Sequence, residues 1–559
     1  MKRVVVFLIV VFCSLSFISI KKTSAKQPSA SSQSWIEAVL SAKKKIDAGL
    51  KQGTITSESA DLDQTMKKLQ LDFPAEMSIA MPYIGSGWKK FLSSADGSFE
   101  EAVVTGICKE FPTSGWFSQR IKEVKSETDS GKRISGLLNL LLTAHHIQQL
   151  GVQLEWLNLA SIMAAVNDMK TAPDFVPEKI NPKLEELRGL VRQGFKGIYE
   201  NNPASIAAAG RALQLKREIL LSNSQLAFDR ILVGRYDMGA TARVDNPSAL
   251  GTQPNNWSNQ LSARRTGFNA EIAEISNLQG DLQYRTIFKP ANGSSVPDLK
   301  LHWDAERLMF SKVDDSKKWQ VFEVGINGEG LRKVIQTDEP DLEFVDACYL
   351  PNNKVIAVSN IGYQAVPCVN GSDAVGNMVL YNPEDGDLRR LTFDQDANWH
   401  PVVMNNGRIM YVRWEYTDLT HYFSRIVMHM NPDGTEQRSL YGSGSVFPTS
   451  IMDVQPIPNH PTRFVGIISG HHGVVRSGRL ILFDPAMDRK EERGMVQEMP
   501  FSKRPIIPIV KDHMVDGVYP QFIKPYPIND KYFLVTAKLS PEGLRSEERR
   551  VGKECRYRW

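Results

Sequence analysis

The sequence holds few of the side chains that most often bind haem or metals, with 5 cysteines and 10 histidines among 559 residues. No cysteine begins a C-x-x-C-H motif, so no c-type haem can be attached covalently within this sequence. There is no C-x-x-C pair either, which excludes a zinc ribbon. Beyond residue 20 no apolar run is long enough to cross a bilayer, and we expect that remainder to be soluble.

The chain between its two ends also lacks an excess of basic residues. The formal net charge is +4, but residues 1–25 carry four basic and no acidic side chains, and residues 544–559 carry six basic and three acidic ones. The residues between these two ends therefore have a net charge of −3. Nucleic-acid binding needs a clustered basic surface, so the sequence predicts a protein that does not bind nucleic acid.

The N-terminus has the pattern of a secretory signal. Lys2 and Arg3 precede an apolar run over residues 4–20, and small residues end at Ala25. This order predicts a signal peptide over 1–25, cleaved after Ala25, and a periplasmic or extracellular protein. A retained N-terminal membrane anchor is the alternative, since the run is long. Residues 26–34 are polar and rich in serine, and we expect a flexible lead-in there.

The last residues, 544–559, differ from the segment before them. They show no β alternation and have a high density of charge. They resemble an adapter sequence read through in frame, so we predict a non-native tail that is not part of the fold. A genuine basic tail is the alternative.

Residues 35–221 read as helical. Apolar residues recur at helical spacing from Trp35, and the segments 137–150 and 154–169 are more apolar, as in buried helices. We find no catalytic signature in this region, and its function is open.

From residue 222 onward the pattern is that of β-strands in a degenerate repeat. Each unit holds an apolar stretch opened by a basic residue, and these residues are Arg307, Lys354, Arg408, Arg463 and Lys531. Asn-Gly or Asp-Gly pairs at 327–328, 385–386 and 433–434 suit tight turns. These basic residues are 47, 54, 55 and 68 residues apart. Repeats of roughly 40–50 residues with several short strands are typical of propeller blades. The sequence therefore predicts a mainly β fold, a multi-bladed β-propeller of TolB or WD40 type over 222–543, preceded by the helical region. The repeats are barely enough for six blades, so we expect an incomplete ring.

Several stretches in the repeats carry a family resemblance. Residues 388–401 resemble the repeat of TolB-type propellers, and residues 222–535 resemble the propeller-bearing middle region of the hydrazine synthase alpha subunit family. The motifs that carry the second resemblance lie at 301–304, 347–351, 398–401, 413–418, 421–425 and 464–473.

The resemblance implies a propeller in an exported protein. In hydrazine synthase it also implies redox chemistry at c-type haems, whose attachment motif this sequence lacks. We therefore predict an exported scaffold that binds a ligand or partner, without hydrazine synthase activity. One alternative is a subunit or fragment of a periplasmic redox enzyme, associated with other subunits of an exported complex. Another is the propeller of a truncated peptidase, which requires a G-x-S-x-G motif that does not follow the repeats here. Whether the protein is an enzyme stays open.

Polar side chains gather in segments that we expect to connect strands at one end of the propeller. The candidate ligand or metal residues are His400, Glu415, Asp418, His421, Arg425, His471, His472 and Arg476. Imidazoles with carboxylates can bind a transition metal or transfer protons. The hypothesis is a site built from His421, His471 and His472, supported by Glu415, Asp418 or Arg425. The alternative is that these side chains hydrogen-bond between blades.

The repeat region holds two cysteines, Cys348 and Cys368. An exported protein can keep disulfides, and Cys348 and Cys368 fall on what we read as neighbouring strands. A bridge between them and two buried thiols are both open.

Overall fold

A computed structural model describes residues 7–11, 30–56, 60–84, 91–92, 97–235, 254–278, 280, 282–366, 371–416, 424–500, 506 and 509–538. These residues divide into two compact units that separate between Leu226 and Ala227. We call them the helical unit and the sheet unit. The sheet unit also includes the N-terminal strand β1.

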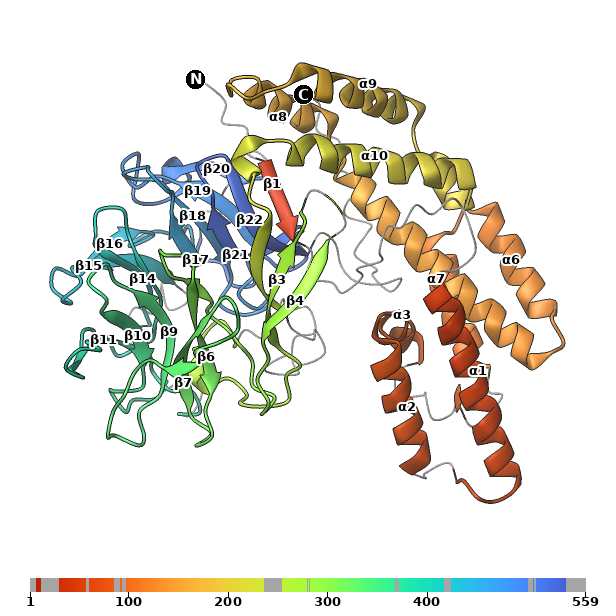
Figure 1. The fold of residues 1–559 in the computed structure, drawn as a ribbon, viewed down its shortest axis with the longest axis horizontal. Coiled ribbons are helices and arrows are strands. Elements are labelled where there is room, and N and C mark those ends of the chain that lie inside the picture. Colours follow the sequence, from red (N-terminus) through yellow and green to blue (C-terminus); the bar gives the residue numbers. More distant parts are fainter. Residues whose placement is uncertain are drawn as a thin grey trace. The chain divides into compact units, whose positions relative to one another are not determined.

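The helical unit holds the nine helices of the described residues (Figure 1). They are α1 (Ala30–Lys51), α2 (Ala60–Asp72), α3 (Pro74–Ile84), α5 (Ser98–Glu110), α6 (Gly115–Ser126), α7 (Ser130–Glu155), α8 (Leu159–Met169), α9 (Pro177–Gln193) and α10 (Pro203–Leu221). Side-chain caps fix several starts: the Asp129 carboxylate accepts the Lys132 N–H at α7, and the Asn202 amide oxygen accepts the Ser205 N–H at α10. A large core cluster packs α7 against the helices around it.

Strands from residue 230 onward form antiparallel sets in sequence order, and we call each set a sheet. The parallel pairing of Arg425 with Ser450 joins the fourth and fifth of them into one eight-stranded sheet. The first is β2 (Arg230–Arg235), β3 (Glu271–Ser276) and β4 (Gln283–Phe288). Next come β5 (Lys300–Leu301), β6 (Arg307–Val313), β7 (Trp319–Gly325) and β8 (Arg332–Lys333), then β9 (Phe344–Tyr349), β10 (Val355–Ser359), β11 (Asn377–Tyr381) and β12 (Leu388–Arg390). The following strands are β13 (Asn398–Val403), β14 (Ile409–Trp414), β15 (Arg425–Met430) and β16 (Arg438–Tyr441), then β17 (Ser450–Pro456), β18 (Phe464–Ser469), β19 (Arg479–Phe483) and β20 (Met495–Met499). The last are β21 (Gln521–Pro527) and β22 (Tyr532–Lys538).

The coarse fold class is confirmed: the chain is mainly β, with several sheets and nine helices in the described part. In the structure, each repeat has a strand that its sequence pattern does not show. The apolar stretches that recur in the sequence are β6, β10, β14, β18 and β22, and each is the second strand of its sheet. A strand with a less regular sequence precedes each of them: β5, β9, β13, β17 and β21. We call these five the inner strands.

The tight turns lie where the sequence predicts them. Asn327-Gly328 joins β7 to β8, and Asp433-Gly434 joins β15 to β16. Gly328 and Gly434 have φ of 92° and 87°, a conformation that glycine adopts without steric cost. Buried apolar residues fill the spaces between neighbouring sheets, with Trp319, Trp399 and Trp414 among the most deeply buried.

Strand β1 (Phe7–Val11) falls within the segment predicted as a signal peptide. It pairs in parallel with β22, from Phe7 opposite Tyr532 to Val11 opposite Thr536. Cleavage after Ala25 would remove β1 and leave β22 at the edge of its sheet. Among the described residues, no helix has both the length and the apolar character that a membrane span requires.

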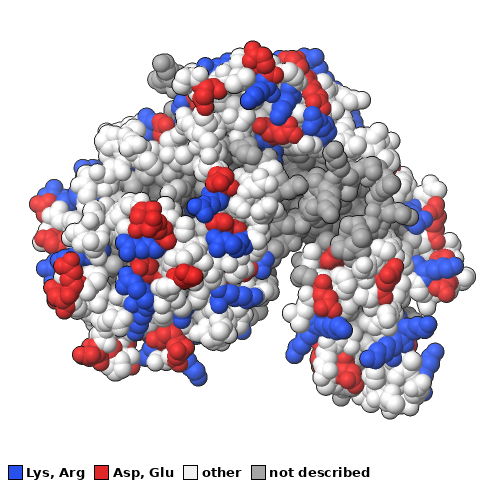
Figure 2. All heavy atoms as spheres, viewed as in Figure 1, with Lys and Arg blue, Asp and Glu red and all other residues white. Residues whose placement is uncertain are grey.

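Charge is mixed on the surface of the sheet unit. On the face shown in Figure 2, basic and acidic side chains are interspersed over the strands and do not form a large area of one sign. This agrees with the small net negative charge of residues 26–543.

Candidate functional site

One residue in or just before each inner strand has a left-handed backbone. These residues are Asp298, Asp346, His400, Asp453 and Lys524, with φ of 62°, 49°, 56°, 50° and 50°. Asp298 lies just before β5, and the other four lie at a break in pairing register between the inner strand and the second strand. A bulge of this kind redirects a side chain out of the sheet's alternation. We call the five residues the axial ring.

The axial ring closes on itself through polar contacts. The Asp346 carboxylate lies 3.1 Å from His400 Nδ1 and accepts the His400 backbone N–H at 2.7 Å. His400 Nε2 is 3.5 Å from Asp453, whose carboxylate contacts Lys524 Nζ at 2.8 Å.

Lys524 Nζ also lies 3.6 Å from the Asp298 carboxylate. The Ser311 hydroxyl completes the ring, because it donates to Asp298 at 3.5 Å and accepts the Asp346 N–H at 3.1 Å. Residues from the first and last inner strands therefore meet, although most of the repeat separates them in sequence.

Burial and charge act against each other in the axial ring. Burial alone would raise the pKa of Asp453, but the charges of Lys524 and His400 outweigh it and lower that pKa to about 2. The pKa of Asp346 is likewise lowered, because His400 outweighs burial. For Asp298, burial and the neighbouring Asp346 charge raise the pKa. Burial lowers the pKa of Lys524, but the three carboxylates reverse this and raise it.

The six candidates that the structure describes fall into more than one set of contacts. His400 belongs to the axial ring, on an inner strand. Glu415 pairs with Arg413 on the preceding strand. Arg476 is buried, and its backbone N–H donates to Asn256 at 2.6 Å. Two candidates, Asp418 and His421, lie outside the described residues, so their part in a site remains a prediction.

Arg425 and His471 form a buried pair. Arg425 Nη1 lies 2.6 Å from His471 Nδ1, and the guanidinium sits 4.5 Å from the ring centre of Trp414. Burial, followed by the Arg425 charge, lowers the pKa of His471 to about 2. His471 is therefore neutral at any physiological pH.

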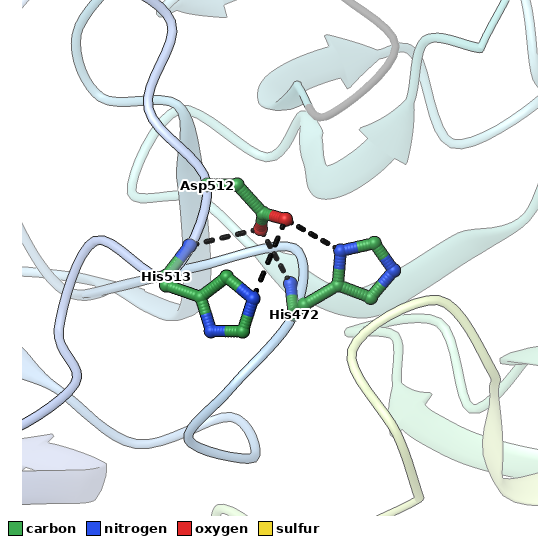
Figure 3. Close-up of side chains that lie close together, drawn as sticks. All are labelled: His472, Asp512 and His513. Atoms are coloured by element: carbon green, nitrogen blue, oxygen red, sulfur yellow. Dashed lines mark hydrogen bonds and ion pairs between the residues drawn. The ribbon is translucent and has the colours of Figure 1, made fainter.

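His472 belongs to a different group, with Asp512 and His513 (Figure 3). One ligand atom from each of the three lies within 4.8 Å of the others. His472 Nδ1 is 2.6 Å from Asp512 Oδ2, and His513 Nε2 is 3.7 Å from the same oxygen. The Asp512 carboxylate thus faces both imidazoles.

Backbone and carboxylate contacts hold this group in place. Asp512 Oδ1 accepts the backbone N–H of His472 at 2.8 Å and that of His513 at 2.9 Å. His513 Nδ1 is 2.8 Å from Asp516 Oδ2, and Asp516 Oδ1 accepts the Val474 N–H at 2.9 Å. The Asp516 hydrogen bond raises the pKa of His513. Burial would raise the pKa of Asp512, but the hydrogen bonds from His472 and His513 lower it.

Topology explains why these loops meet. In an antiparallel sheet of four sequential strands, the connection from the second to the third strand and the connection out of the fourth emerge at the same end. His471 and His472 lie in the first kind of connection, between β18 and β19. Asp512, His513 and Asp516 lie in the second kind, between β20 and β21. The sequence reasoning missed these three, although an Asp-His pair followed by an aspartate three residues later was a visible signal.

Replacing Gly473 with alanine is expected to destabilise the sheet unit. Gly473 has φ of 84°, and a Cβ there would collide with the Asp516 carboxylate. Gly386 has a similar φ of 78° and no atom within 4 Å of such a Cβ, so Gly386→Ala is the matched control. We expect about 1 kcal/mol of lost unfolding free energy for the control and at least 1 kcal/mol more for Gly473→Ala, measured by urea unfolding. Equal losses would show that the Asp516 contact is unimportant.

Cys348 is buried and forms no disulfide with another described residue, and burial raises the pKa of its thiol to about 12. Cys368 lies outside the described residues, and the bridge between the two cysteines stays a prediction.

Comparison with known proteins gives distant likenesses only. No family model and no curated protein matches the chain. Among solved structures, the Kuenenia stuttgartiensis hydrazine synthase is 11% identical over 57% of this chain and 45% of that one, with a TM-score of 0.38. A TolB protein from Agrobacterium tumefaciens, described as putative in its own name, is 13% identical over 52% of this chain and 90% of that one, with a TM-score of 0.34. An oligogalacturonate lyase in complex with manganese is 14% identical over 42% of this chain and 62% of that one, with a TM-score of 0.30. The chain thus spans less than half of the hydrazine synthase chain, and its structural neighbours include hydrazine synthase and TolB-like proteins at low identity.

Proposed function

We propose that residues 222–543 form a β-propeller and that the protein is an exported scaffold which binds a ligand or partner at one end of it. The observation that carries the architecture is the axial ring. Five sequential sheets each place one charged or imidazole side chain, at an equivalent position, into one closed set of contacts. Sheets stacked in a row would not bring Lys524 to Asp298, whereas sheets arranged around an axis do.

The inner strands support the same arrangement. Strand β9 lies next to β13, β13 next to β17, and β17 next to β21, so each inner strand adjoins that of the following sheet. We therefore assign the inner strands to the wall of a central channel and the axial ring to its interior. TolB-type blades are the nearest description of these repeats, on the motif over 388–401.

The proposed binding end is the one where the loops 470–478 and 509–518 meet. Histidine, aspartate and tryptophan side chains converge there from separate segments: the ring of Trp257 is 5.3 Å from that of His472 and 5.9 Å from that of His471, and His472 contacts Asp512 at 2.6 Å. Loops held by a rigid set of strands are common binding sites in propellers. Other subunits of an exported complex are candidate partners.

Export is tested on the N-terminus of the mature protein. The full chain is expressed with its own signal, the cells are fractionated, and the N-terminus is sequenced. We expect a chain that begins at Lys26 in the periplasmic fraction. A chain that keeps residues 1–25 and stays in the cytoplasm would refute export, and one that keeps them in the membrane would indicate the anchor.

Binding is tested by thermal shift on the full chain against sugars, amino acids, dicarboxylates and short peptides. A ligand of the proposed end raises the Tm by mass action, and Trp257→Ala removes that rise. Trp303→Ala is the control, because Trp303 is an exposed tryptophan in the turn between β5 and β6. A rise that Trp257→Ala leaves unchanged would place binding elsewhere.

A further inference from the structure

We propose that His472, Asp512 and His513 bind one divalent transition-metal ion of the zinc class. Two imidazoles with one carboxylate are a common ligand set for zinc sites that keep an open position for water or another ligand. The inference rests on contacts within the two loops and is independent of export and of the number of sheets in the ring.

The spacing of the ligand atoms suits such an ion. Metal–ligand bonds of about 2.1 Å in a tetrahedral site place the ligand atoms about 3.4 Å from one another. The two contacts of Asp512 Oδ2, at 2.6 Å to His472 Nδ1 and 3.7 Å to His513 Nε2, lie on either side of that value. A small rotation of the side chains would therefore bring both imidazoles and the carboxylate to bonding distance.

The surroundings have the features of a metal site's outer shell. A metal-binding histidine usually donates its other ring N–H to a carboxylate, a backbone carbonyl or water, which fixes the orientation of the ring. His513 meets this condition, because its Nδ1 contacts Asp516 and its Nε2 faces Asp512. Asp516 is fixed in turn by the Val474 N–H.

The site is also open to an incoming ion. The side chains of His472 and His513 are 44% and 56% exposed, while Asp512 is 23% exposed. Solvent therefore reaches both imidazoles, and water can complete the coordination of a bound ion.

A histidine–carboxylate pair elsewhere in the sheet unit differs from the group of His472, Asp512 and His513. His302 contacts Asp304 through Nδ1 at 2.8 Å, and its Nε2 contacts Arg307 at 3.0 Å. Both ring nitrogens are thus engaged, one of them by a cation, and no second imidazole among the described residues joins the pair. His302 is the matched control for the test.

The test is zinc and cobalt binding by the full chain, purified without a histidine tag and stripped with a chelator. Zinc titration is followed by calorimetry, and Co²⁺ is followed by its visible absorption, which reports the ligand set. We expect one equivalent bound by the wild type and by His302→Gln, and none by His513→Gln or Asp512→Asn. Asp516→Asn should keep the cobalt spectrum and weaken binding by about 10- to 100-fold, as expected for an outer-shell residue.

Circular dichroism and the Tm without metal confirm that each variant is folded. His513→Gln changes an exposed side chain, so it reports on binding even if Asp512→Asn disturbs the loops. A wild type that binds no zinc or cobalt would overturn the proposal. So would wild-type affinity in both His513→Gln and Asp512→Asn.

Discussion

Lys524→Met is expected to lower the free energy of unfolding by about 3 kcal/mol, because it leaves buried carboxylates without their cation. Lys524 Nζ is the ammonium group within 4 Å of both Asp453 and Asp298, and these two side chains are only 5% and 6% exposed. The Lys524 side chain itself is 35% exposed, but removing it is costly because the two carboxylates stay desolvated without their cation. Methionine keeps most of the apolar length of lysine, so the change isolates the charge.

Lys318→Met is the matched control. Lys318 Nζ lies 3.1 Å from Asp341, whose side chain is 73% exposed. An exposed pair of this kind contributes at most about 1 kcal/mol. Urea unfolding of both variants, followed by near-ultraviolet circular dichroism of the sheet unit, measures the difference. Similar small losses for the two variants would mean that the axial ring does not stabilise the fold.

Replacing aspartate with asparagine is expected to have different effects on the free energy of unfolding at Asp453 and at Asp298. Asp453 has its pKa lowered to about 2, whereas the ordinary value of an unfolded aspartate is about 3.9. Its ionised form therefore stabilises the folded state, by about 2 to 3 kcal/mol at neutral pH. Asp453→Asn is expected to remove that contribution.

The charge of Asp298 has the opposite effect on the stability of the folded state. Burial and Asp346 raise its pKa, so its charge is unfavourable in the folded state at neutral pH. Asp298→Asn is expected to leave stability unchanged or to increase it. The structure thus predicts that the same substitution destabilises at one position of the axial ring and not at the other.

The pH dependence of folded-state stability follows from the directions of these two pKa shifts. The contribution of Asp453 is complete above about pH 4 and is lost as the pH falls toward 2, where the folded-state carboxylate takes up its proton. The wild type should therefore lose stability between pH 4 and pH 2, and Asp453→Asn should lose less over that range. Asp298 acts the other way, because its raised pKa favours the folded state below pH 4 and disfavours it at higher pH. Equal acid sensitivity in the wild type and Asp453→Asn would contradict the assigned role of Asp453.

The sequence was sufficient for the order of the elements. Helical spacing before residue 222 and apolar stretches at regular intervals after it are local patterns, and local patterns survive in a single sequence. The turns at Gly328 and Gly434 followed from the same logic, since a tight turn needs residues that tolerate positive φ.

The inner strands were harder to predict. Their shared feature is one apolar residue followed by a polar one, as in Val345-Asp346, Trp399-His400 and Met452-Asp453. That pair lies 7 to 10 residues before the basic residue of each repeat, which was the available signal. The convergence of the five side chains depends on bulges and on the arrangement of whole sheets, and neither is a local property.

The metal group shows the same limit. His472 was a candidate from its sequence, but its partner Asp512 is 40 residues away, in a connection that the repeat pattern does not cover. Only the pairing of β18 with β19 and of β19 with β20 shows that the two connections meet. Contact between such loops is set by topology, which the residues around His472 do not encode.

The most direct test of the account is a double-mutant cycle between Asp298 and Lys524. These residues belong to the first and last inner strands, and only closure of the axial ring brings them to 3.6 Å. Unfolding free energies of the wild type, Asp298→Asn, Lys524→Met and the double variant give their coupling. The account predicts a coupling of about 1 kcal/mol or more, with Asp298→Asn more favourable once Lys524 is absent. Additive effects within about 0.3 kcal/mol would show that the two residues do not meet and would contradict the propeller.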